Sequence, residues 1–94
     1  MTIEVMLLTR RECLFCHDAE LILDRLVGEF NLRVRSVDID LDVGRRLAAQ
    51  GGFLFPPGIL VDGEAFSYGR PSEKKLRREL ARRALQQPDS LAAG

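Results

Sequence analysis

Two cysteines separated by two residues stand between a segment typical of a β-strand and a segment typical of an α-helix. Residues 3–8 are almost all apolar, which is typical of a central strand covered on both faces. After Cys13 and Cys16, apolar residues recur at spacings of three and four, which predicts an amphipathic helix over 16–30. The chain has no other cysteine. A dithiol at a strand-to-helix junction therefore limits the folds that this chain can adopt.

The rest of the chain continues to alternate strands with helices. The alternation of apolar and polar residues predicts a second strand, and Asp62-Gly63 is a strong signal for a two-residue hairpin turn. Pro71 suits the first position of the last helix. The expected elements are strands at 3–8, 32–40, 59–61 and 64–68, and helices at 16–30, 43–50 and from 71 onward. This order predicts an α/β fold with a four-stranded mixed sheet and helices on both faces.

Length and composition indicate one small domain. The 94 residues are 46% hydrophobic and 30% charged, which is ordinary for a soluble globular protein. We expect one domain over 1–87 and a disordered tail over 88–94, where small and polar residues prevail. The formal net charge is zero, so no overall field favours a nucleic-acid or membrane partner. We expect the protein to be a monomer.

The N-terminal residues predict the compartment. They lack a basic region followed by a long apolar segment, so we expect no secretory signal and a cytoplasmic location. Thiols are held reduced in the cytosol, where a cysteine pair is more often catalytic or metal-binding than a structural crosslink.

The position of the pair predicts different roles for its two thiols. A thiolate, not a thiol, attacks a disulfide, and a helix start favours the anion through its free N–H groups and its dipole. Cys13 lies at that start, and Arg10 and Arg11 nearby act in the same direction. Cys16, one turn later, is expected to be more buried. We therefore predict that Cys13 is the catalytic nucleophile and Cys16 the resolving thiol.

Three other interpretations use the same residues. Two buried structural cysteines would need no chemistry. Cys13 to His17 has the spacing of a covalent haem attachment, but haem attachment needs export and His17 is the only histidine. A zinc site would need four ligands, and the sequence offers the two cysteines, His17 and scattered carboxylates. We expect no metal and no cofactor.

Three stretches resemble the glutaredoxin branch of the thioredoxin superfamily. They are Leu8-Thr9-Arg10-Arg11-Glu12-Cys13-Leu14-Phe15-Cys16, Val37-Asp38-Ile39-Asp40 and Pro57-Gly58-Ile59-Leu60-Val61-Asp62-Gly63. The resemblance spans roughly residues 3–87. It implies a thioredoxin-like, glutaredoxin-type fold of three layers and a small thiol–disulfide oxidoreductase, an enzyme that exchanges disulfides through its cysteine pair.

The resemblance also implies which residues contact the substrate. These are Arg10, Leu14, Phe15, Pro56 and Pro57, with a cis peptide bond before Pro57. At Pro56 this chain departs from the family, because proline has no N–H to offer to glutathione or a peptide.

A second departure lies near the last helix. Arg70 stands in the region where the family holds the ammonium group of glutathione. We therefore expect weak use of glutathione and a protein or peptide disulfide as substrate, with Phe53 or Phe55 beside the dithiol and at least one of them in the core. A reductase or a low-molecular-weight thiol would restore the dithiol.

Two questions of function remain open at this stage. The same fold could carry a redox switch that alters binding without catalytic turnover. The last helix is rich in cations, which usually form a solvated face and in some proteins a docking site for an acidic partner. The cations are Lys74, Lys75, Arg77, Arg78, Arg82 and Arg83.

Overall fold

The computed structural model describes residues 2–86, and these residues form the strands and helices in the predicted order. The strands are β1 (Ile3–Thr9), β2 (Leu32–Asp38), β3 (Gly58–Val61) and β4 (Glu64–Tyr68). The helices are α1 (Leu14–Val27), α2 (Asp42–Gly51) and α3 (Glu73–Gln86). The tail 88–94, for which we predicted disorder, lies outside the described residues.

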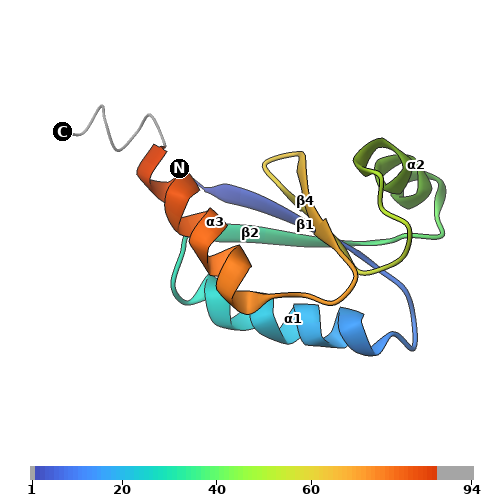
Figure 1. The fold of residues 1–94 in the computed structure, drawn as a ribbon, viewed down its shortest axis with the longest axis horizontal. Coiled ribbons are helices and arrows are strands. Elements are labelled where there is room, and N and C mark those ends of the chain that lie inside the picture. Colours follow the sequence, from blue (N-terminus) through green and yellow to red (C-terminus); the bar gives the residue numbers. More distant parts are fainter. Residues whose placement is uncertain (1, 87–94) are drawn as a thin grey trace.

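The strands form one mixed sheet in the spatial order β2-β1-β3-β4. β1 runs parallel to β2 and antiparallel to β3, and β4 runs antiparallel to β3. Figure 1 shows α1 and α3 on one side of the sheet and α2 on the other. This arrangement confirms the predicted three-layer α/β architecture. None of the helices within residues 2–86 is long and apolar enough to cross a membrane.

The larger core lies between the sheet and the helices α1 and α3. Its buried residues are Ile3, Val5, Leu7, Ile59 and Val61 from the strands and Ala19, Ile22, Leu23, Leu26, Leu76 and Leu80 from the helices. Leu76 and Leu80 are fully buried, and Ala84 packs against them with part of its surface exposed. These three residues form the apolar stripe of α3 that faces the sheet.

The smaller core lies on the other face, under α2. Leu8 and Leu60 from the sheet meet Ile39, Ala48 and Phe53 there. Helix α2 is short and covers one end of the sheet (Figure 1). Glu4, toward the other end of β1, is exposed on this face. The prediction that the first strand is covered on both faces is therefore right only for its C-terminal half.

Both ends of α1 and the start of α3 differ from the predicted boundaries. Helix α1 begins at Leu14, with Cys13 as its extended N-cap residue, and ends at Val27, before the predicted end at residue 30. At α3, the Ser72 hydroxyl accepts a hydrogen bond from the Lys75 N–H (3.2 Å), as an N-cap serine does. Pro71 thus precedes the cap and does not occupy the first helical position.

The predicted hairpin turn is confirmed by its backbone. Asp62 has φ 50° and Gly63 has φ 82°. Two successive residues with positive φ are what a type I′ turn requires, and this turn matches the twist of the strands that it joins. The turn places β4 at the outer edge of the sheet.

Candidate redox site

Three loops meet at the end of the sheet where β1 leads into α1. The parallel register pairs Thr9 with Asp38, and the antiparallel register pairs Leu8 with Gly58. Neighbouring strands lie about 5 Å apart. The loop that follows Thr9, the loop that follows Asp38 and the loop that precedes Gly58 therefore emerge at one edge of the sheet, where the cysteines lie.

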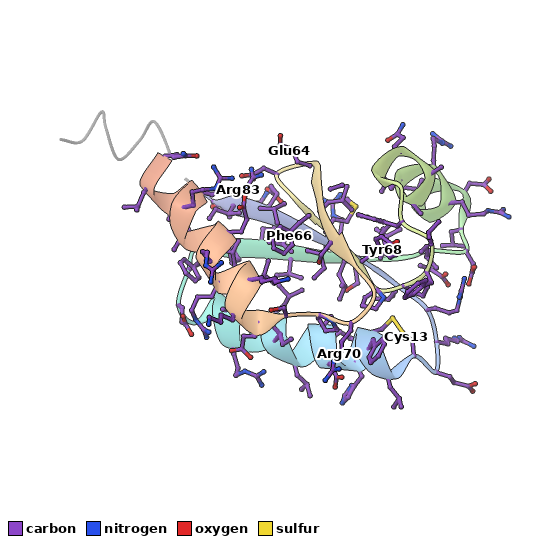
Figure 2. All side chains as sticks on the ribbon, in the orientation of Figure 1. Cys13, Glu64, Phe66, Tyr68, Arg70 and Arg83 are labelled. Carbon is purple, nitrogen blue, oxygen red and sulfur yellow. A yellow bond between two sulfur atoms is a disulfide. The ribbon has the colours of Figure 1, made fainter. Side chains whose placement is uncertain are left out.

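Cys13 and Cys16 form a disulfide in this structure. Their Cα atoms are 5.1 Å apart, within the usual range for disulfides. The Cys16 residue is 2% exposed, whereas Cys13 is partly exposed. Figure 2 shows the disulfide at the N-terminal end of α1. The structure thus brings together a partly exposed first cysteine and a buried second cysteine, one helical turn apart.

The sulfur of Cys13 occupies the position of an N-cap side chain. The Sγ atom of Cys13 accepts a hydrogen bond from the backbone N–H of Cys16 (3.1 Å), and the carbonyl oxygen of Cys13 accepts one from the N–H of His17 (3.0 Å). Once the disulfide is reduced, a thiolate on Cys13 would lie at the free N–H groups of the first turn, at the positive end of the helix dipole. This position stabilises an anion.

Arg10 lies at the same edge but is already paired. Its Nε and Nη2 atoms each donate a 2.9 Å hydrogen bond to the carboxylate of Asp40. This pairing raises the pKa of the Arg10 guanidinium and lowers the pKa of the Asp40 carboxyl, in both cases mainly through the hydrogen bonds between them. Any carboxylate that binds Arg10 from solution must compete with Asp40.

Glu12, directly before the nucleophile, has an unusual backbone conformation. Its φ of 53° lies in the left-handed region, which residues with a side chain seldom adopt. The turn at Arg11-Glu12 lets the chain leave β1 and enter α1 with Cys13 extended as the cap. No sequence signal pointed to this conformation, because glutamate is not a typical residue for it.

The Pro56-Pro57 segment lies beside the cysteine loop. Continuing the register of β1 with β3 places Pro57 next to Thr9. Both prolines are buried, and the peptide bond between them is cis, as the family resemblance implied. The carbonyl oxygen of Pro57 accepts a 2.8 Å hydrogen bond from the N–H of Gly69. Pro56 has no N–H to offer to a substrate backbone.

Exposed apolar side chains form a rim beside the disulfide. Leu14 (83% exposed) and Phe15 (41% exposed) form the first turn of α1, and Phe55 is 50% exposed in the loop before Pro56. Phe53 is buried in the smaller core instead. The prediction that at least one of the two phenylalanines fills the core is therefore confirmed.

Tyr68 also belongs to this rim, although no pattern in the sequence placed it among the site residues. Its ring makes an edge-to-face contact with Phe55 (centroids 5.3 Å apart) and a tilted contact with Phe53 (5.9 Å). Tyr68 ends β4 and pairs with Gly58, so strand pairing brings it to the site. Such a contact depends on tertiary structure and has no local signal.

His17 is exposed on the first turns of α1. Within residues 2–86, no group of three or more histidine, cysteine, aspartate or glutamate side chains is arranged to hold a metal ion.

The comparisons with known proteins bear on the fold. No family model matches the sequence, and no curated protein matches it. Among solved structures, the chain is similar to a mutant thioredoxin from Halobacterium salinarum NRC-1, with a TM-score of 0.64 and 21% identity. The match covers 83% of this chain and 71% of the thioredoxin. The chain therefore has a thioredoxin-like fold, with its cysteine pair at the junction of the first strand and first helix.

Proposed function

We propose that this protein is a small thiol–disulfide oxidoreductase of glutaredoxin-like type. The observation that carries the proposal is the position of Cys13: its sulfur caps α1, accepts the N–H of Cys16 and is bonded to a buried partner. The thioredoxin-like fold around this pair supports the same conclusion. A structural crosslink would have no need for a partly exposed cysteine at a helix N-terminus.

The reaction would proceed through a mixed disulfide. The Cys13 thiolate attacks one sulfur of the substrate disulfide, which forms a Cys13–substrate bond and releases the other substrate sulfur as a thiolate that takes up a proton. The Cys16 sulfur, after losing its proton, then attacks Cys13 Sγ and releases the second substrate thiol. Two electrons have passed from the dithiol to the substrate, and the Cys13–Cys16 disulfide remains. A reductase or a low-molecular-weight thiol returns the two electrons.

The surroundings of the pair favour a polypeptide substrate over glutathione. The rim of Leu14, Phe15 and Phe55 suits apolar side chains. Arg10 is held by Asp40, so the contact expected for a carboxylate of glutathione is weakened. We propose that Arg10, Leu14, Phe15, Pro56 and Pro57 contact a protein or peptide disulfide. We also propose that the protein works as a monomer in the cytoplasm, where reduced thiols would convert its disulfide back to the dithiol.

Turnover of a neutral disulfide tests this function. The protein is mixed with bis(2-hydroxyethyl) disulfide and a regenerating thiol, and product is followed at steady state. We expect many turnovers per molecule for the natural chain and none for Cys13→Ser. Without the regenerating thiol, we expect a trapped mixed disulfide for Cys16→Ser. Equal effects of the two substitutions would overturn the assigned roles.

The same assay separates the enzyme from a redox switch. A switch would be oxidised once, slowly, and would then stay oxidised while the regenerating thiol is present. Sustained turnover that rises in proportion to protein concentration supports the oxidoreductase. A single oxidation event per molecule contradicts it.

A further inference from the structure

A basic groove lies between the edge strand β4 and helix α3. It encloses about 480 Å³. One wall is the run Phe66, Ser67 and Tyr68, and three of the cations that line it are Arg70, Lys75 and Arg78. Figure 2 shows Tyr68 and Arg70 on the side of Phe66 that is toward Cys13.

The cations of α3 form a row along the groove. Lys75, Arg78 and Arg82 are spaced by three and four residues, so they share one face of the helix, and all three line the groove. Leu76 and Leu80 lie between them in sequence and are buried against the sheet. Seven residues of helix span about 10 Å. Three or four residues of an extended chain cover the same length, at about 3.3 Å each.

Much of this positive charge is not compensated. Within residues 2–86, the side chains of Arg70, Lys75 and Arg78 form no ion pair. The one carboxylate in the lining, Glu79, already accepts hydrogen bonds from the guanidinium groups of Arg82 and Arg83. The groove therefore presents an excess of positive charge to solvent.

The groove leads to the redox site. Tyr68 belongs to its wall, and the ring of Tyr68 contacts Phe55, which directly precedes Pro56. β4 pairs with β3 on one side only and is the outer strand of the sheet in the described part of the chain. An extended chain that lies along β4 would pass from the cation row to the apolar rim of the disulfide.

We propose that this groove binds an extended acidic segment of the protein whose disulfide is exchanged at Cys13. The inference rests on the proposed function and names the partner class: a polypeptide with several aspartates or glutamates near its reactive cysteine. The carboxylates would pair with Arg70, Lys75 and Arg78, and long-range attraction would speed the encounter of the two molecules.

Matched disulfide peptides test the proposal. One peptide carries four glutamates beside its cysteine, and the other carries four glutamines. We expect kcat/KM to be about tenfold higher for the acidic peptide at low salt, and this preference to shrink in 0.5 M NaCl because salt screens exposed charges. Equal kcat/KM values for the two peptides at low salt would overturn the proposal.

Charge-reversal variants locate the effect. Lys75→Glu with Arg78→Glu reverses the two cations of the row that form no ion pair, and we expect it to abolish the preference for the acidic peptide. Lys74→Glu with Arg46→Glu changes the net charge equally, at exposed positions outside the groove, and should keep most of the preference. The same loss in both variants would mean that only net charge matters, and would overturn the proposal. Turnover of bis(2-hydroxyethyl) disulfide should be unchanged in all of them.

A direct binding measurement tests the groove without depending on the proposed oxidoreductase activity. A fluorescent acidic peptide in which serine replaces cysteine should bind the natural chain and the Lys74/Arg46 control alike, and bind the Lys75/Arg78 variant about tenfold more weakly. This result would stand even if no disulfide were turned over. A single-stranded oligonucleotide that binds the natural chain more tightly than the acidic peptide does would overturn the proposal in favour of a nucleic-acid site.

Discussion

The Sγ atom of Cys13 lies 3.1 Å from the backbone nitrogen of Cys16, whose N–H points at it as it would at a capping oxygen. The two cysteines are thus related by a hydrogen bond of the helix terminus as well as by the disulfide. The N–H and the helix dipole belong to the backbone, and we expect them to stay in place when the disulfide is reduced. They can then stabilise a thiolate on Cys13.

The first prediction concerns the ionisation of the two thiols. In the reduced protein, the pKa of Cys13 should lie below the value of about 8.5 that a free cysteine has. Cys16 should react slowly with alkylating agents because it is buried. Iodoacetamide labelling against pH, read by mass spectrometry, measures both thiols. In denaturant the two should react alike, and a Cys13 midpoint at or above that of the denatured chain would contradict the prediction.

Asp40 is predicted to keep Arg10 from anionic thiols. The register of β1 with β2 carries both residues to the same edge of the sheet, where they pair through two hydrogen bonds. Replacing Asp40 by Asn removes the competing charge. Reduction of the Cys13–Cys16 disulfide by glutathione should then become roughly two- to fivefold faster, since exposed ion pairs are weak.

A neutral thiol is the control for Asp40→Asn. The rate with 2-mercaptoethanol should be unchanged, because that thiol carries no carboxylate. Arg10→Gln combined with Asp40→Asn should return the glutathione rate to that of the natural chain. If Asp40→Asn leaves the glutathione rate unaltered, Arg10 is not a contact for anionic thiols.

Pro56 is predicted to weaken the binding of a peptide backbone. Alanine at this position supplies an N–H in the segment next to the cysteine loop, and a net hydrogen bond contributes about 1 kcal/mol. KM for a peptide disulfide should therefore fall about fivefold in Pro56→Ala. kcat/KM for bis(2-hydroxyethyl) disulfide, which has no backbone to pair, should stay the same. A parallel change for both substrates would show that the substitution acts by disturbing the loop.

Gly44 is predicted to be required for the packing of α2 against the site. A Cβ atom at this position would overlap the carbonyl oxygen of Asp38 and lie 2.8 Å from the Cα atom of Ile39. Gly44→Ala should therefore lower the free energy of unfolding by about 1–3 kcal/mol, as overpacking does. Chemical denaturation measures this. Gly28→Ala is the control, since a Cβ there meets only the Arg25 carbonyl oxygen at 3.4 Å, and it should have little effect.

Much of the fold could be predicted because its signals are local. The apolar periodicity of α1 and the alternation along β2 mark these elements directly, and Asp62-Gly63 marks the hairpin. The cysteine pair marked the site for the same reason, since its spacing and its place after a strand are visible in sequence. The start of α1 was missed by two residues because cysteine is not among the usual N-cap residues.

The remaining features of the site depend on strand register and on packing between distant segments. Arg10 pairs with Asp40 because β1 and β2 align, and Tyr68 reaches Phe55 because β4 folds back on β3. The exposed face near Glu4 follows from the position of α2, which periodicity does not encode. The sequence alone indicated Arg10 as a ligand contact, but it could not show that Arg10 is already paired with Asp40.

The carboxylates between α1 and α3 predict a loss of stability in acid. Glu73 accepts hydrogen bonds from Arg25 and Arg77, and these lower its pKa from the ordinary 4.5, with the Arg25 hydrogen bonds as the largest cause. Arg77 also pairs with Glu29, whose pKa is lowered in the same way. A carboxyl with a lowered folded pKa stabilises the fold above its unfolded pKa, and this contribution disappears as pH falls through the folded pKa.

Glu73→Gln should therefore be less stable than the natural chain at pH 7, and the difference should vanish as the solution is acidified below pH 4.5 toward full protonation. Urea denaturation at a series of pH values measures the difference. Glu20→Gln, at an exposed position of α1 without an ion pair in residues 2–86, is the matched control and should match the natural chain throughout. If the deficit of Glu73→Gln stayed constant down to the lowest pH, it would come from lost packing. The ion pairs would then not hold α3 to α1.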